Sequence, residues 1–189
     1  NLSLKKLKDK LINAKNNNKL PKIIIPVHYA GQSCEMKEIK ALSEEFNFRI
    51  IEDGSHAIGG KYLEENIGCC RFSDITVFSF HPVKIITTGE GGVAVTNDPY
   101  LSDKMKSLRS HGITRNIEDL RSNPQNEIWN YDQNSIGFNY RIPDINCALG
   151  LSQLEKLEMF IKRRAEIATI YNNAFKKTSL ITPWQHPNT

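Results

Sequence analysis

Several features that would place this chain in a special class are scarce or absent. Its 189 residues include four cysteines, and only Cys69 and Cys70 are close together, at a spacing that matches no common zinc site. We interpret them as free thiols in a reducing cytoplasm, without a bound metal. No apolar run approaches the roughly 20 residues of a membrane span, and no signal peptide opens the chain. We therefore expect a soluble, cytoplasmic protein.

A strong charge of one sign is also lacking. The formal net charge is +4, and its excess lies in the first 22 residues, where lysines outnumber the single acid Asp9. Leu4, Leu7 and Leu11 recur there at helical spacing, which places the lysines on the wet face of an amphipathic helix. Nucleic-acid binding would require interleaved aromatic residues or a recognised motif. We expect no nucleic-acid partner.

Nucleotide-binding glycine loops are missing too. No Walker-type loop is present, and no G-x-G-x-x-G opens a helix. The glycines of 89–92 (GEGG) permit a tight turn or a close backbone approach, and turn chemistry is the simpler reading. The sequence therefore gives no support for a dinucleotide fold or a P-loop.

What is present is typical of an α/β domain. Hydrophobic residues make up 39% and charged residues 24%, close to the average for globular proteins, and the length suits about one domain with a real core. We predict strands at 22–28, 74–81 and 92–96, a further strand that starts at 49–51 and ends at 52–54, and helices at 35–47 and 99–110. Strand, helix and strand in that order favour a parallel sheet with a right-handed crossover.

Three further segments complete the organisation. The glycine-rich stretch 59–68 is expected to form a small hairpin or flap. The polar, asparagine-rich stretch 113–136 has little periodicity, and a loop of that length is usually functional or disordered. An apolar stripe predicts one long helical stretch over 143–175. Because the chain begins inside a helix and stops shortly after another, we expect a fragment of a longer protein.

Asp53 is the first candidate site residue. In an open α/β sheet, ligands bind at the carboxyl ends of strands, and Asp53 lies at the end of a predicted strand. A carboxylate in a dry crevice needs a cationic partner, and a protonated pyridine nitrogen would be one. The alternative is a cap on the next loop through backbone N–H groups. Both interpretations remain open at this point.

Ser79 lies near the end of the next predicted strand, and Lys84 follows that strand. A partly desolvated Lys84 amine could condense with an aldehyde, whereas the alternative is a surface lysine with a buried stem. The Ser79 hydroxyl could bind phosphate or satisfy a backbone group. His56, three residues past Asp53, could hydrogen-bond a cofactor oxygen or be purely structural.

The order and spacing of these segments carry more information than any one of them. The chain resembles the DegT-type sugar aminotransferases in a series of motifs: 52–57 (EDGSHA), 78–84 (FSFHPVK), 88–92 (TGEGG), 108–112 (LRSHG), 137–141 (GFNYR) and 148–154 (ALGLSQL). The likeness extends over nearly the whole chain, and ordered motifs are far more specific than single patterns.

The resemblance implies a fold-type I enzyme of the aspartate-aminotransferase type, dependent on pyridoxal 5′-phosphate (PLP), with a central, mostly parallel sheet flanked by helices. Carried over by position, Lys84 is the catalytic residue that forms the Schiff base with PLP. Asp53 pairs with the pyridine nitrogen and Ser79 binds the cofactor phosphate. His56 occupies a position that is often Gln in relatives and contacts the ring hydroxyl.

The resemblance also implies a homodimer with shared active sites. Asn139 and Arg141 match residues that reach the phosphate of the cofactor in the partner subunit. Residues 1–142 would be part of the PLP-binding large domain, 143–176 a long helix leading to the carboxyl-terminal domain, and 177–189 the start of that small domain. Family members carry a phosphate loop and a stacking aromatic residue upstream, so we expect these 189 residues alone to bind PLP weakly.

The activity implied is transfer of an amino group, in which an amino acid (glutamate in most relatives) donates nitrogen and a keto-sugar nucleotide accepts it. The segments 25–34 (IPVHYAGQSC) and 55–60 (SHAIGG) are most similar to a branch of pseudaminic acid biosynthesis, which aminates the C4 keto carbon of a UDP-linked 4-keto-6-deoxy-N-acetylhexosamine. Two alternatives remain. One is a sugar dehydratase of the same fold, although members of that branch carry His where this chain has Lys84. The other is a non-catalytic truncated or regulatory chain.

Overall fold

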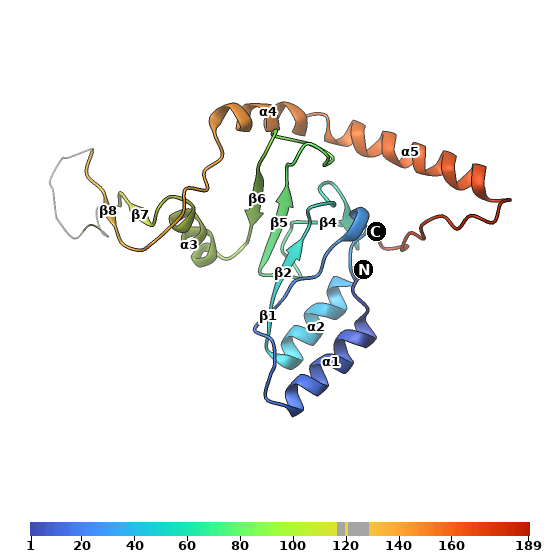
Figure 1. Cartoon of the computed structure of the whole chain (residues 1–189), viewed down its shortest axis with the longest axis horizontal. Helices are drawn as coiled ribbons and strands as arrows, with labels where there is room; N and C mark the ends of the chain where they lie inside the picture. Colours follow the sequence, from blue (N-terminus) through green and yellow to red (C-terminus); the bar gives the residue numbers. More distant parts are fainter. Residues whose placement is uncertain (117–119, 121–128) are drawn as a thin grey trace. The chain divides into compact units, whose positions relative to one another are not determined.

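The computed structural model of the protein describes residues 1–116, 120 and 129–189 (Figure 1). The chain divides into two compact units. The first comprises Asn1–Asn97 together with Asp144–Thr189, and the second is Asp98–Pro143. The helices of the described part of the chain include none with the length and apolarity that a bilayer crossing requires.

A four-stranded sheet forms the centre of the first unit. Its strands are β1 (Ile23–Ile24), β2 (Arg49–Asp53), β5 (Ile75–Ser79) and β6 (Gly92–Val95), in the order β1-β2-β5-β6. β1, β2 and β5 run parallel, and β6 is antiparallel to β5. The loop between β5 and β6 contains no crossover helix, so the chain returns in the opposite direction. The prediction of a mostly parallel sheet flanked by helices is confirmed.

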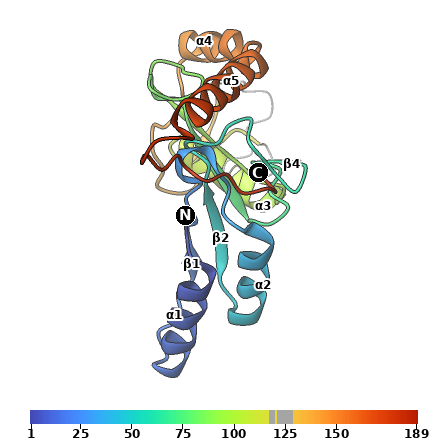
Figure 2. The same ribbon diagram turned by 90° about the vertical axis from the view of Figure 1, so that its right-hand side faces the viewer.

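Two helices supply the main core. α1 (Leu4–Asn16) begins at the cap Ser3, whose hydroxyl accepts the Lys6 N–H, and α2 is Met36–Phe46. Their buried leucines and isoleucine lie in one cluster with β2: Leu7, Leu11, Ile39, Leu42 and Ile50. α1 packs against α2, and α2 against β2 (Figure 2). The amphipathic helix predicted from the leucine spacing is confirmed.

The strand predicted at 22–28 is only partly correct, because β1 ends at Ile24. Pro26 has no N–H to donate to a neighbouring strand. Its carbonyl nevertheless accepts the Asp53 N–H at 2.9 Å, and the His28 N–H donates to the Asp53 carbonyl at 3.0 Å. The chain after β1 therefore continues alongside the end of β2 without regular strand geometry.

The predicted hairpin is confirmed as β3 (Lys61–Tyr62) paired with β4 (Glu65–Asn66). The single long helix predicted over 143–175 is wrong in one respect, since it is two helices, α4 (Asp144–Leu154) and α5 (Leu157–Phe175). The Lys156 N–H donates to the carbonyl three residues back rather than four, and this tightening ends α4.

The second unit contains α3 (Pro99–Arg109), which begins at the cap Asp98. The Asp98 carboxylate accepts the Tyr100 N–H at 2.8 Å, as expected for a strong N-cap. β7 (Ile113–Thr114) pairs antiparallel with β8 (Asp132–Gln133), so the stretch 113–136 is not wholly irregular. Its central part, 117–119 and 121–128, lies outside the described residues.

Candidate active site

The parallel register brings two of the sequence candidates to one edge of the sheet. Asp53 of β2 is paired with Val77 of β5, and β5 ends two residues later at Ser79. Lys84 follows in the loop that returns to β6. Because carboxyl ends of adjacent parallel strands meet at one edge, this edge collects a carboxylate, a hydroxyl and an amine.

Asp53 is half-buried, and its Oδ1 accepts the Ser55 N–H at 3.0 Å. Burial acts to raise the pKa of Asp53. The hydrogen bonds from Ser55 and the nearby side chains of His56 and Lys84 act in the opposite direction and outweigh burial, so the pKa of Asp53 lies below its ordinary value. The capping interpretation of Asp53 is therefore correct as far as Oδ1 is concerned. The same carboxylate also lies in the electrostatic field of the Lys84 side chain.

The Lys84 amine is the nucleophile that this edge offers. Its backbone N–H donates to the His81 carbonyl at 2.9 Å in a turn, and the side chain is half-buried. Within the described part of the chain, Lys84 Nζ makes no hydrogen bond or ion pair. An amine that is partly withdrawn from water and not held by a salt bridge is suited to condensation with a carbonyl carbon.

His56 is held by contacts with Tyr29 and Ala30, which the sequence analysis did not predict. Its Nδ1 accepts the Ala30 N–H at 3.3 Å, and its ring meets Tyr29 edge-on at a centroid distance of 5.9 Å. A neutral imidazole whose Nδ1 accepts carries its proton on Nε2, so His56 presents an N–H donor. Ala30 has a left-handed backbone, with φ 55°, which nothing in the sequence around it predicted.

Ser79 is half-buried at the end of β5, and its Oγ accepts the His81 N–H at 3.4 Å. The hydroxyl thus satisfies a backbone group, which was one of the two predicted roles. Its proton remains available to donate to an anionic oxygen.

A buried polar cluster behind this edge was missed by the sequence analysis. His28 Nε2 and Glu52 Oε2 lie 2.7 Å apart, with the imidazole fully buried. The hydroxyls of Ser73 and Thr76 donate to Glu52 Oε1, and the Cys34 N–H donates to His28 Nδ1 at 3.1 Å. Because Glu52 immediately precedes Asp53, this cluster anchors the strand end that carries the candidate carboxylate.

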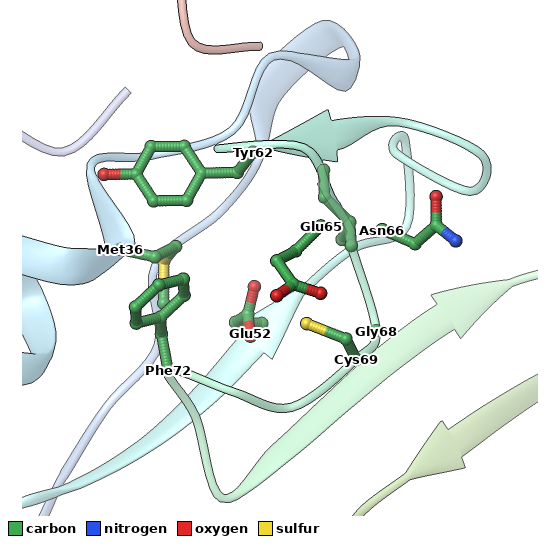
Figure 3. Close-up of a pocket in the computed structure, with 9 residues that line it drawn as sticks. Met36, Glu52, Tyr62, Glu65, Asn66, Gly68, Cys69 and Phe72 are labelled. Atoms are coloured by element: carbon green, nitrogen blue, oxygen red, sulfur yellow. The ribbon is translucent and has the colours of Figure 1, made fainter.

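A small cavity lies on the other side of Glu52 and is lined by side chains from α2, β2 and the hairpin (Figure 3). Figure 3 shows Glu52, Glu65 and Cys69 around this space, with Tyr62 and Phe72 to one side. Its volume is about 10 Å³, which suits about one water molecule. Neither Asp53 nor Lys84 lines it, so it is separate from the candidate site.

Replacing Glu52 tests the stabilising role of this cluster. Glu52→Ala leaves the His28 imidazole and two hydroxyls buried without their acceptor, so we expect the free energy of unfolding to fall by about 3 kcal/mol. Urea denaturation measures the change. Glu65→Ala is the matched control, because its ion pair with Arg71 is solvent-exposed and such pairs contribute about 0–1 kcal/mol. Equal losses in both variants would contradict the role assigned to Glu52.

The last two candidates, Asn139 and Arg141, lie in the second unit and are both exposed. Asn139 forms a backbone bridge with Ser110, so the motifs 108–112 and 137–141 lie side by side. The Gly137 position shows how closely they pack, because a Cβ there would lie 2.3 Å from the Gly112 nitrogen. The first unit thus holds Asp53, His56, Ser79 and Lys84, and the second holds Asn139 and Arg141.

A mostly parallel sheet flanked by helices, with a carboxylate, a hydroxyl and a lysine amine at or just beyond the carboxyl ends of its strands, defines the class as an α/β domain with a polar strand-end edge. The chain belongs to the DegT/DnrJ/EryC1/StrS aminotransferase family, whose model matches residues 1–189. A curated relative from Campylobacter jejuni, named UDP-4-amino-4,6-dideoxy-N-acetyl-beta-L-altrosamine transaminase, is 41% identical over 94% of this chain and 43% of its own length.

Solved structures agree with this assignment. A Helicobacter pylori aminotransferase involved in the biosynthesis of pseudoaminic acid is 38% identical, with a TM-score of 0.76 over 85% of this chain and 40% of its own. A structure from Streptococcus pneumoniae in a PLP form is 29% identical, with a TM-score of 0.66 over 83% of this chain and 42% of its own. The chain spans less than half the length of the curated relatives that it matches.

Proposed function

We propose that this chain is the cofactor-binding part of a PLP-dependent sugar-nucleotide aminotransferase, with Lys84 as the residue that attaches the cofactor. The observation that carries the proposal is the register of β2 against β5, which pairs Asp53 with Val77 and places the half-buried Asp53 carboxylate at the sheet edge from which the Lys84 loop leaves. A carboxylate and a lysine amine at one strand-end edge are the two groups that PLP chemistry requires most directly.

The donor set at this edge matches the chemical parts of PLP one by one. Asp53 suits a protonated ring nitrogen, and the Lys84 amine suits the aldehyde carbon. The His56 Nε2–H suits the ring hydroxyl, and the Ser79 hydroxyl suits a phosphate oxygen. The Asp53 pairing joins opposite charges, the His56 and Ser79 pairings join a hydrogen-bond donor to an acceptor, and the Lys84 pairing joins a nucleophile to an electrophilic carbon.

When bound, PLP supplies an aldehyde that accepts amines and a ring that withdraws electrons from the carbon attached to nitrogen. The chain's own residues do the rest in this proposal. Asp53 keeps a proton on the ring nitrogen through its negative charge. The Lys84 amine, when it is free of the cofactor, would carry a proton between the substrate carbon that bears the nitrogen and the C4′ carbon of the cofactor.

For the substrates, we propose an amino acid donor, glutamate by the family resemblance, and a UDP-linked 4-keto-6-deoxy-N-acetylhexosamine as acceptor at its C4 keto carbon. Support comes from the Campylobacter jejuni relative, whose name specifies a UDP-amino-dideoxy-sugar transaminase. Lys84 argues against the sugar dehydratase alternative, which by the same resemblance would carry His at this position.

For the assembly, we propose a homodimer in which Asn139 and Arg141 reach the partner's cofactor phosphate. Both side chains are exposed on the second unit, and an amide with a guanidinium suits a phosphate group. We further propose that 1–142 belongs to the large domain, 143–176 links it to a smaller domain, and 177–189 begins that domain. A cytoplasmic location is part of the same proposal.

Chemical trapping tests the attachment directly. The polypeptide from the complete reading frame that contains these residues is incubated with PLP, reduced with borohydride and digested. We expect the pyridoxyl group on the peptide that carries Lys84, because reduction makes the carbon–nitrogen link permanent. Modification at another lysine, or none above the level of a PLP-free control, would refute the proposal.

A further inference from the structure

The loop that carries Lys84 is closed at its base by hydrogen bonds to one residue. The Thr88 N–H and the Thr87 hydroxyl donate to the Phe80 carbonyl at 3.0 and 2.9 Å, and the Phe80 N–H donates to the Gly91 carbonyl at 2.9 Å. Lys84 itself is held by one backbone hydrogen bond in a turn. The position of its amine therefore depends on where the base of the loop, 87–91, is held.

The base of this loop is hydrogen-bonded to α4. Asn146 Nδ2 donates to the carbonyls of Thr88 and Glu90, which joins the helix to the loop across 58 residues of sequence. These hydrogen bonds tie the base of the loop to the helix, because moving the base away from α4 would break both of them.

Gly150, one turn further along α4, lets the helix approach. A Cβ at Gly150 would lie 2.7 Å from Thr88 Cγ2, well inside van der Waals contact. Thr88 is 3% exposed, and its hydroxyl donates to the Glu90 carbonyl at 2.8 Å. The methyl group cannot rotate away without breaking that hydrogen bond, since both groups share one χ1 angle.

We propose that α4 is the positioning element for Lys84, acting through Asn146 and Gly150 on the base of the loop. Neither residue touches the amine, so both are positioning residues rather than catalytic ones. The inference rests on the proposed function, because it assigns a purpose to the placement of the Lys84 amine. It also gives a physical reason for the glycine in the motif 148–154.

A double-mutant cycle between Gly150 and Thr88 isolates this contact. Gly150→Ala places a methyl group against Thr88 Cγ2, whereas Thr88→Ser removes Cγ2 and keeps the hydroxyl. Ser152→Ala is the matched control on an exposed position of α4. Alanine ordinarily stabilises a helix relative to glycine. A loss of PLP affinity or a changed acetylation rate at Lys84 in Gly150→Ala is therefore attributable to the contact with Thr88.

The first measurement needs no cofactor. The complete polypeptide without PLP is treated with limiting acetic anhydride, and the acetylation rate of each lysine is followed by peptide mass spectrometry. We expect Gly150→Ala to change the rate at Lys84 by about threefold or more, because moving the loop changes the exposure of the half-buried amine and its separation from the Asp53 charge, which together set the accessible fraction of neutral amine. Lysines of α1 should keep their rates, and Gly150→Ala with Thr88→Ser should return Lys84 to the rate of Thr88→Ser alone.

The second measurement is PLP affinity by absorbance titration. We expect Gly150→Ala to lower the affinity, and Gly150→Ala with Thr88→Ser to return it to the affinity of Thr88→Ser alone. If Gly150→Ala does not fold, Asn146→Ala provides the test, and it should change the Lys84 rate without changing those in α1. An unchanged rate at Lys84 in the folded variant, or a change that Thr88→Ser does not reverse, would overturn the inference. Absence of PLP from Lys84 in the unmutated protein would instead refute the proposed function, while the acetylation rates would still decide the positioning role.

Discussion

Replacing Lys84 by alanine is expected to lower turnover by at least about 1000-fold, because the substitution removes both the attachment point and the proton carrier. The visible absorbance of covalently bound cofactor should disappear at the same time. Steady-state kinetics with glutamate and a UDP-keto-sugar, together with a spectrum of the protein with PLP, measure both effects.

The matched control is Lys61→Ala, which removes an exposed lysine of the hairpin and should leave both readouts unchanged. Added methylamine should restore part of the turnover of Lys84→Ala, because a free amine can carry the proton without being attached to the chain. Wild-type turnover in Lys84→Ala would remove this residue from the mechanism.

Asp53→Asn is expected to have the second-largest effect, a fall in kcat of about 100- to 1000-fold. The amide keeps the size of the side chain and can still accept the Ser55 N–H that Asp53 Oδ1 accepts at 3.0 Å. It loses the negative charge that would hold a proton on the ring nitrogen. The defect should therefore appear mainly in kcat, with the stability of the fold nearly preserved.

Two measurements separate this charge effect from a packing effect. Thermal unfolding should place Asp53→Asn close to the unmutated protein, since the capping hydrogen bond remains. Asp53→Glu, which restores the charge at a displaced position, should recover more of kcat than Asp53→Ala does. If Asp53→Asn keeps normal kcat, or if its defect is matched by a global loss of stability, Asp53 acts only as the cap on the following loop.

Much of the framework could be predicted from periodicity. Leu7 and Leu11 alone indicated the buried face of α1, and both are in the main core. Errors arose where a single local feature overrode the pattern. Pro26 interrupts the strand that the run of isoleucines predicted, and the hydrogen-bond shift at Lys156 divides one predicted helix into two. Such features depend on individual backbone donors, which a hydrophobic pattern does not report.

The candidate site was predictable only in part. Asp53 and Ser79 end strands and Lys84 follows one, and all three could be found from that position. The loop at Ala30 and the contacts of Asn146 could not, because they join segments far apart in the sequence: Ala30 donates to His56, and Asn146 donates to Thr88. The left-handed backbone of Ala30 adds to the difficulty, since that conformation is uncommon outside glycine and asparagine.

By itself, the sequence determined the class of fold, the order of its motifs and the residues that end the strands, because these follow from short-range spacing and from side-chain chemistry. The tertiary structure decided which of these residues lie at the same edge of the sheet, which nitrogen of His56 accepts a backbone N–H, and which helix is hydrogen-bonded to the lysine loop. Those relations depend on distances between segments that are remote along the chain, and packing in three dimensions is what sets such distances.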